Sequence, residues 1–335
     1  MRKDQRRKFL LASGALLAAP LTIAQQATRK IRIGVLQIGT EAALKSTDQA
    51  FLSGLRDRGY VSGQNLVADF RYSDGNGDRL RALAEELVAL RPDVLVGTEI
   101  TSFFLKAKTS TIPIVLLTST DPVATGLVKS LSRPGTNVTG MSGQLTTLVA
   151  KQVEVLIELV PRMSRIALLT ASVNLPKDNP YFGRPDPWVV AAEAAAKAKG
   201  LALVVVRAKD AESLREAFAT LRRERCEGVV FAANAVIARL MRESVDGMRL
   251  LRVPSVSGTR GYADAGGLLG YGPLAVENYR YSAKFVDLIV RGANPADIPV
   301  EQVSRFELVV NQKAARELGI NIPDTILLRA DRVIE

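Results

Sequence analysis

The chain has 335 residues, enough for one large or two medium domains, and its formal net charge is +11. It contains no histidine, so the commonest general base and the commonest neutral metal ligand are both missing. Its arginines are scattered among glutamates and aspartates on predicted helices, which favours solvated helix faces over a nucleic-acid site. We therefore expect no catalytic residues, no metal, no cofactor and no nucleic-acid partner.

The N-terminal residues 1–24 have the pattern of an export signal. The basic residues Arg6, Arg7 and Lys8 precede an apolar run, Phe9 to Ala19, that is too short to span a bilayer. Small residues at Thr22 and Ala24 predict cleavage after Ala24. The Arg pair favours twin-arginine export, with the Sec route as the alternative. No cysteine stands directly after the apolar run, so we expect a soluble periplasmic protein and not a lipoprotein.

Short β-rich apolar runs alternate with helical patterns along the rest of the chain, as in parallel α/β folds. The expected strands of the first half are Ile31–Leu36, Leu66–Tyr72, Asp93–Gly97, Ile112–Thr118 and Asn137–Gly140. Those of the second half are Ile166–Thr170, Leu201–Val206, Gly228–Ala233, Val253–Ser257 and Gly267–Tyr271. The sequence predicts two Rossmann-like lobes with parallel sheets flanked by helices.

The two halves follow the same plan. Leu66 follows Ile31 at the same interval at which Leu201 follows Ile166. Each second strand leads to an aspartate, Asp74 or Asp210, before a helix rich in Leu, Arg and Glu, and we expect both to cap those helices. Ligands of open parallel sheets lie beyond the carboxyl ends of the strands, so two such lobes predict a small-molecule site between them.

The single cysteine, Cys226, can form no internal disulfide, and its place before an apolar strand predicts a buried structural thiol. In the segment Arg133 to Gly140, the turn residues predict that Gly135 and Gly140 serve backbone geometry. The sequence holds no Gly-x-Gly-x-x-Gly, P-loop or Gly-x-Ser-x-Gly motif. These features favour a binding protein over an enzyme.

From Arg32 to Glu335 the chain resembles the periplasmic substrate-binding components of a family of ABC importers that includes tryptophan- and tyrosine-binding members. The resemblance is carried by GLRDRGYVSGQNLVADFRYSDG, STIPIVLLTSTDPVATGLVKSLSRPGTNVTGMS, YADAGGLLGYGP and IPVEQVSRFELVVNQKAARELGINIPDTILLRADRVIE. It implies the type I periplasmic binding protein architecture with three interlobe crossings. It also implies a membrane permease and an ATPase subunit as partners of a monomer that docks at the permease.

With that architecture, we expect residues 29–141 and 272–303 to form one lobe, and residues 142–271 and 304–335 to form the other. The ligand expected from the resemblance is an aromatic or branched amino acid, or a similar small carboxylate. Two other classes remain as alternatives: an exported α/β enzyme acting on a small molecule, and a ligand-sensing module related to repressor effector domains.

One segment departs from the family pattern. The loop between residues 171 and 188 is longer than in relatives and brings Tyr181, Phe182 and Trp188 to the carboxyl end of a predicted strand. These aromatic side chains either cover the ligand or pack onto the loop's own helix, and the sequence leaves both open.

The residues expected to contact the ligand follow the carboxyl ends of the predicted strands. Asp121 suits an ammonium group, with the alternative that it caps a helix beginning near Val123. The hydroxyls of Thr98 and Ser119 suit a carboxylate. The full set is Gln37, Thr40, Glu41, Thr98, Glu99, Ser119, Asp121, Thr139, Thr170, Asn234 and Arg260.

The export signal makes a direct prediction. The N-terminal sequence of the exported protein should begin near Gln25, because the small residues at Thr22 and Ala24 fit the cleavage site of a signal peptidase. Edman sequencing of the protein from the culture fraction that holds exported proteins measures this. Recovery of Met1 would contradict it.

Overall fold

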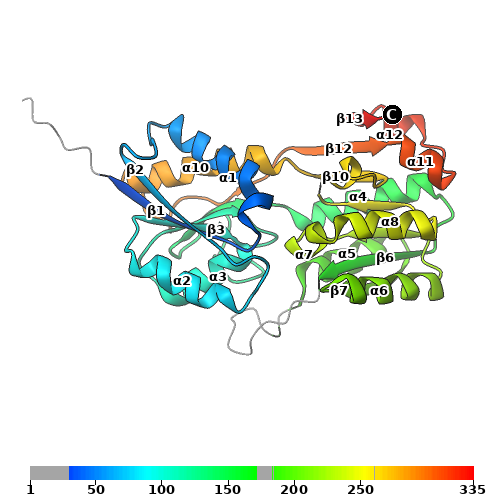
Figure 1. Ribbon diagram of the computed structural model, residues 1–335, viewed down its shortest axis with the longest axis horizontal. Coiled ribbons are helices and arrows are strands. Elements are labelled where there is room, and N and C mark those ends of the chain that lie inside the picture. Colours follow the sequence, from blue (N-terminus) through cyan, green and yellow to red (C-terminus); the bar gives the residue numbers. More distant parts are fainter. Residues whose placement is uncertain (1–29, 172–182, 184, 260) are drawn as a thin grey trace, which may run out of the picture. The chain divides into compact units, whose positions relative to one another are not determined.

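The computed structural model describes residues 30–171, 183, 185–259 and 261–335, which form two β-sheets with helices on both faces of each (Figure 1). The proposed signal, the aromatic residues Tyr181 and Phe182, and the predicted site residue Arg260 lie outside the described residues. The α/β class that the alternating pattern predicted is confirmed.

The first sheet has six parallel strands in the order β11-β5-β4-β3-β1-β2. Helices α1 (Glu41–Arg56) and α10 (Ala275–Val290) cover one face, and α2 (Arg79–Ala89) and α3 (Glu99–Lys108) cover the other. The strands are β1 (Ile31–Gln37), β2 (Leu66–Tyr72), β3 (Val94–Thr98), β4 (Ile114–Thr118), β5 (Val138–Ser142) and β11 (Glu301–Gln302).

Strand β1 shows why this sheet is buried on both faces. Successive side chains of a strand point to opposite faces. Ile33 and Val35 therefore join the core under α1 and α10, whereas Leu36 joins the core under α2 and α3, and none of the three is exposed. Such near-continuous apolar strands are typical of parallel sheets covered on both sides.

The second sheet has seven strands in the order β13-β12-β10-β9-β8-β6-β7. Strands β10 and β12 pair with each other in antiparallel fashion, and every other neighbouring pair is parallel. The strands are β6 (Arg165–Ala171), β7 (Ala202–Ala208), β8 (Gly228–Phe231), β9 (Ser255–Ser257), β10 (Leu269–Pro273), β12 (Phe306–Asn311) and β13 (Arg332–Ile334).

Helices cover both faces of the second sheet as well. One face packs against α4 (Leu145–Leu159), α5 (Pro187–Ala198), α11 (Gln312–Leu318) and α12 (Asp324–Leu327). The other face packs against α6 (Ala211–Arg223), α7 (Ala235–Arg239), α8 (Met241–Leu251) and α9 (Gly261–Asp264).

The chain passes between the two sheets three times, as the resemblance implied. It leaves the first sheet after β5, returns to it after β10, and leaves it again after β11. The first and third passages are tied together, because Gln144 donates a hydrogen bond from Nε2 to the carbonyl oxygen of Val303 over 2.7 Å.

Of the two predicted helix caps, one is confirmed and the other is wrong. Asp210 caps α6 as expected, since its Oδ1 accepts from the backbone nitrogen of Ser213 over 2.9 Å within a capping box. The prediction for Asp74 is wrong. It lies in a turn with φ +56° and binds Arg79 over 2.5 Å, and α2 begins only after Asp78. The extra turn contains two glycines, Gly75 and Gly77, which delay the start of the helix.

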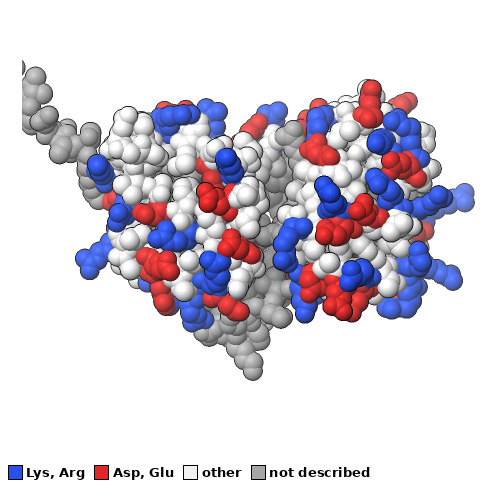
Figure 2. Space-filling view, in the orientation of Figure 1, with Lys and Arg blue, Asp and Glu red and all other residues white. Residues whose placement is uncertain are grey.

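Two further expectations about single residues are confirmed. Cys226 is buried, and burial raises the pKa of its thiol, which keeps it in the unreactive protonated form. Gly135 and Gly140 both have positive φ, +61° and +131°. On the face shown in Figure 2, Lys and Arg are interspersed with Asp and Glu over both sheets' helices, consistent with solvated helix surfaces.

Gly140 carries a prediction for stability. Its φ of +131° is unfavourable for other residues, and a Cβ atom there would lie 2.4 Å from the carbonyl oxygen of Leu116 on the neighbouring strand. We expect Gly140→Ala to lower the free energy of unfolding by about 2–4 kcal/mol, from strain and overpacking together. The measurement is urea unfolding.

Gly63 provides the matched control. Its φ is +82°, and a Cβ atom on this residue would meet nothing within 4 Å. Gly63→Ala should therefore lower the free energy of unfolding by only about 1 kcal/mol, the cost of a positive φ for a residue with a side chain. Equal losses for the two variants would contradict the account of Gly140 as a site of close backbone approach.

Candidate functional site

The predicted site residues of the first sheet gather at its carboxyl edge. Strands β1, β3 and β4 are neighbours in the sheet, and all three are parallel. The loops that follow them therefore emerge side by side. These strand ends and the residues that follow them carry Gln37, Thr40 and Glu41, then Thr98 and Glu99, and then Ser119 and Asp121.

Glu99 connects two of these loops. It is the first residue of α3 and only 6% exposed. Its Oε2 accepts hydrogen bonds from the backbone nitrogen of Thr120, over 2.8 Å, and from the Thr120 hydroxyl. Its Oε1 accepts from the hydroxyl of Thr125 over 2.9 Å. Burial raises the pKa of the Glu99 carboxyl, while these donors oppose that rise.

Asp121 caps a turn rather than a helix. Its Oδ1 accepts from the backbone nitrogens of Val123, over 3.1 Å, and Ala124, over 2.9 Å. The helix expected from Val123 is absent: residues 122–126 form consecutive turns. Its Oδ2 receives no hydrogen bond from the described part of the chain, so half of the carboxylate is available for another donor.

A second buried carboxylate, Asp48 of α1, lies beneath the β1 loop and is 6% exposed. Its Oδ1 accepts from Gln37 Nε2 over 2.7 Å, and its Oδ2 accepts from the Tyr72 hydroxyl over 2.8 Å. Burial is the main cause that raises the pKa of Asp48, and the charge of Glu41 adds to it. Burial and the bond to Asp48 raise the pKa of the Tyr72 hydroxyl. Gln37 is wholly buried by these contacts.

The side chains of the remaining predicted residues of the first sheet make different hydrogen bonds. Thr40 is exposed and caps α1 by accepting from the backbone nitrogen of Ala43 over 3.3 Å, and Glu41 beside it is exposed. The Ser119 hydroxyl donates to the carbonyl oxygen of Met141 over 2.7 Å. The Thr139 hydroxyl donates to the carbonyl oxygen of Ile298 over 2.8 Å. Thr139 is fully buried and lies away from the strand-end loops.

Thr98 is the predicted residue whose hydroxyl is least committed. It is partly exposed at the N-terminal end of α3 and makes no side-chain cap. Its Oγ1 lies 3.4 Å from the Oγ1 of Thr101, a long contact, and Thr101 donates to the Thr98 carbonyl oxygen over 3.1 Å. The Thr98 hydroxyl is therefore able to turn toward another acceptor.

On the second sheet, the strand-end residues hold the start of α5. Asp186 caps this helix through Oδ1, which accepts from the backbone nitrogen of Trp188 over 2.9 Å. Its Oδ2 accepts from the Thr170 hydroxyl over 3.2 Å and from Arg207 Nη1 over 3.1 Å. Trp188 lies within α5, is 7% exposed and packs in the core of the second sheet, so it is a core residue of that helix and not a loop residue folded onto it.

Asn234 follows β8 and caps the short helix α7. Its Oδ1 accepts from the backbone nitrogen of Ile237 over 3.0 Å, and its side chain is partly exposed. No described residue accepts a hydrogen bond from its Nδ2 group. The structure thus places Asn234 and Thr170 at the same edge of the second sheet, because β6 and β8 are parallel neighbours.

Sequence reasoning missed the residues that support these loops: Asp48, Tyr72, Thr120, Thr125, Asp186 and Arg207. One signal was present for Asp48. It lies three residues before Phe51 on the apolar face of α1, where a charged residue is unexpected. Tyr72 is the last residue of its strand, which places it at the carboxyl edge. The contacts of Thr120 and Thr125 depend on Glu99, which lies far away in sequence.

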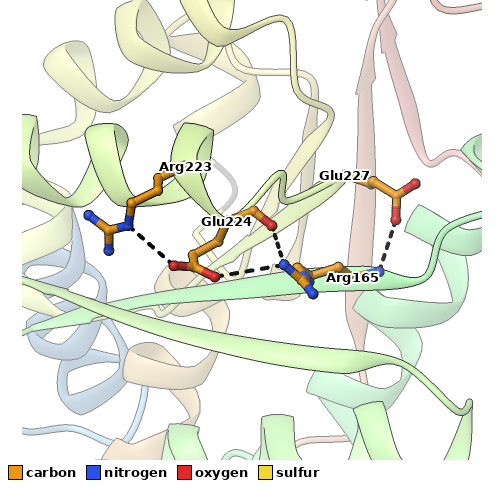
Figure 3. Close-up of polar contacts among 4 residues, drawn as sticks. All are labelled: Arg165, Arg223, Glu224 and Glu227. Carbon is orange, nitrogen blue, oxygen red and sulfur yellow. Dashed lines mark hydrogen bonds and ion pairs between the residues drawn. The ribbon is translucent and has the colours of Figure 1, made fainter.

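A different polar cluster lies at the opposite, amino edge of the second sheet (Figure 3). Arg165 Nη1 donates to the Glu224 carbonyl oxygen over 2.6 Å, and Glu224 also pairs with Arg223 over 3.3 Å. Glu227 Oε2 accepts from the backbone nitrogens of Ser164 and Arg165, which lowers the pKa of its carboxyl. Arg165 also pairs with the Glu224 carboxylate over 3.7 Å, so Arg165, Glu224 and Arg223 form a structural ion-pair network, whereas Glu227 is held by backbone N–H groups.

The described residues match neither the pattern of a metal site nor that of a membrane-spanning helix. Within residues 30–171, 183, 185–259 and 261–335, no group of three His, Cys, Asp or Glu side chains is placed to hold a metal ion. No helix in the same ranges is both long enough and apolar enough to cross a membrane.

The family model described as "ABC transporter substrate binding protein" matches residues 32–334. A curated "Tyrosine-binding protein" from Clostridioides difficile (strain R20291) is 24% identical over 299 residues, which cover 86% of this chain and 81% of that protein.

Solved structures agree with this match. A domain from Streptococcus pneumoniae in complex with L-Trp is similar with a TM-score of 0.80 and 27% identity, covering 91% of this chain and 100% of that one. A conserved domain protein from Vibrio cholerae has the same TM-score and coverage with 28% identity. The leucine-binding protein LivK of Thermotoga maritima, at 12% identity and a TM-score of 0.59, shares the fold alone, over 86% of this chain and 87% of its own.

The buried Asp48 carboxyl predicts a pH effect on stability. Because burial raises its pKa above the ordinary value of 3.8, the folded chain binds this proton more tightly than the unfolded chain. Its stabilising contribution is therefore complete below that value and is lost as the pH rises through the folded-state pKa. We expect the unfolding free energy of the wild type, relative to Asp48→Asn, to fall over this window.

Urea unfolding of both proteins at a series of pH values from about 4 to about 8 measures this difference. The slope should reach at most about 1.4 kcal/mol per pH unit, the value for one proton. A difference between wild type and variant that does not change with pH would show that Asp48 is not proton-linked to folding.

Proposed function

The chain belongs to the family of ABC transporter substrate-binding proteins, and from this we propose that its ligand is an aromatic amino acid, tyrosine or tryptophan. The observation that carries the proposal is the likeness over 91% of the chain to a structure that holds L-Trp. The tyrosine-binding relative supports the same ligand class. The family and these relatives are substrate-binding proteins and not enzymes, as the sequence suggested.

The fold is that of type I periplasmic binding proteins, with the chain passing three times between two α/β sheets. We propose that residues 29–141 and 272–303 work as one lobe and residues 142–271 and 304–335 as the other. A ligand with higher affinity for the closed arrangement of such lobes shifts the protein toward it. That closed form is what a permease would recognise, with the energy supplied by its ATPase subunit.

We propose that the ligand meets the strand-end loops of both sheets. The ammonium group of an amino acid is assigned to the free Oδ2 of Asp121, since a charge-assisted hydrogen bond there is strong. The carboxylate is assigned to the Thr98 hydroxyl and the N-terminal end of α3, where backbone N–H groups favour an anion. Gln37, Thr40, Glu41, Thr170, Asn234 and Arg260 remain proposed neighbours of the ligand.

The same family and the N-terminal segment support a proposal for the location in which the protein works. We propose that the protein acts in the periplasm after removal of residues 1–24, as a soluble monomer without a lipid anchor. Its proposed partners are the permease and the ATPase of an ABC importer.

Titration calorimetry of the purified protein tests the ligand class. L-tyrosine or L-tryptophan should bind with a dissociation constant of about 1 μM or lower, equivalent to about −8 kcal/mol. L-leucine and D-glucose serve as controls, because other type I binding proteins take aliphatic amino acids or sugars. Binding of a control without binding of either aromatic amino acid would overturn the proposal.

Asp121→Asn tests the assignment of the ammonium group. We expect it to weaken binding of the aromatic amino acid by about 1.5–3 kcal/mol, because the charge-assisted bond is lost. The melting temperature without ligand should hardly change, since asparagine keeps the Oδ1 acceptor that caps the turn. Asp78→Asn is the control, because Asp78 makes no side-chain cap at α2. A lower melting temperature with unchanged affinity would reduce Asp121 to a cap.

A further inference from the structure

The turn that carries Asp121 has no regular secondary structure of its own. Residues 119–126 follow β4 without entering a helix. At one end of the turn, the Ser119 hydroxyl donates to Met141, and the backbone nitrogen of Gly143 donates to the Ser119 carbonyl oxygen over 2.6 Å. This end is therefore fixed to β5. The next residues, which include Asp121, need a different support.

Glu99 supplies that support from another strand-end loop. Its two carboxyl oxygens together accept three hydrogen bonds from Thr120 and Thr125, the residues on either side of Asp121 in the turn. Every donor is neutral, and Glu99 forms no ion pair with a described Lys or Arg. The carboxyl group therefore acts as a set of acceptors around which the turn is folded.

Thr125 shows how this network tolerates a proton on Glu99. Its hydroxyl lies 2.9 Å from Glu99 Oε1 and 2.9 Å from the Asp121 carbonyl oxygen, and it has only one proton to donate. If Thr125 donates to Asp121, a protonated Glu99 can donate to Thr125 in turn. A glutamine at position 99 can form the same hydrogen bonds as the protonated carboxyl group. Its side-chain oxygen would accept from Thr120, and its side-chain NH2 group would donate to Thr125.

We infer that Glu99 is a positioning residue of the ligand site: its buried carboxyl group holds the Thr120–Thr125 turn so that Asp121 Oδ2 is presented to the ligand. The inference rests on the proposed function for the identity of the ligand, but the hold on the turn is a property of the free protein. Glu99 acts through acceptor geometry and not through its charge. Its conservative replacement by glutamine should therefore preserve the site, whereas alanine should not.

The test compares Glu99→Ala, Glu99→Gln and Glu86→Ala, an exposed glutamate on α2 that serves as the control. Hydrogen exchange of the peptide covering residues 119–126 is measured without ligand, and L-tyrosine and L-tryptophan binding is measured by calorimetry. Glu99→Ala should lose protection in this peptide and weaken binding by about tenfold, since its former donors are left unpaired. Glu99→Gln and Glu86→Ala should stay within about threefold of the wild type.

The outcomes separate this inference from the ligand proposal. Unchanged exchange and unchanged affinity in Glu99→Ala would overturn it, and so would a loss in Glu99→Gln as large as in Glu99→Ala. If the wild type binds neither amino acid, the ligand proposal fails and the exchange comparison decides the positioning role. If Glu99→Ala does not fold, Thr125→Val, which removes one hydroxyl from the network, takes its place in both measurements.

Discussion

The structure depends on the first sheet being completed by a segment, α10 and β11, that lies in sequence between two strands of the second sheet. Helix α10 lies in sequence between β10 and β12 of the second sheet but packs against α1 on the first. The contact is close: a Cβ atom on Gly54 would lie 2.1 Å from the carbonyl oxygen of Arg280. The Tyr60 hydroxyl also donates to Asp287 over 2.8 Å. The two sheets are thereby parts of one interwoven fold and not successive independent domains.

This arrangement leaves the strand-end loops free for binding, and two buried carboxyl groups give them order. Glu99 holds the loop after β4, and Asp48 holds Gln37 at the end of β1. Neither has a cationic partner among its hydrogen bonds, which are all to neutral groups. Burying such groups is costly and is tolerated only when their hydrogen bonds are satisfied. Burial raises the pKa of both carboxyls.

The sequence predicted β1 to β10 because a parallel sheet buried on both faces needs continuous apolar runs, such as that of β1, but it did not predict β11, β12 or β13. The cap at Asp210 was predictable because it depends on Ser213 nearby. The cap at Asp74 was not, because a glycine-containing turn intervenes. The roles of Glu99 and Asp48 were missed because they depend on contacts between loops and elements distant in sequence. For the ligand contacts themselves, the lobe boundaries and the export signal, the sequence-based assignments remain predictions.

We propose that this chain carries an aromatic amino acid between the strand-end loops of its two sheets. Native mass spectrometry of the protein isolated from the compartment where it works measures the bound molecule directly. The account predicts one tyrosine or tryptophan for each protein chain, released when the protein is denatured. A sugar, an aliphatic amino acid or another unrelated small molecule in its place would contradict it.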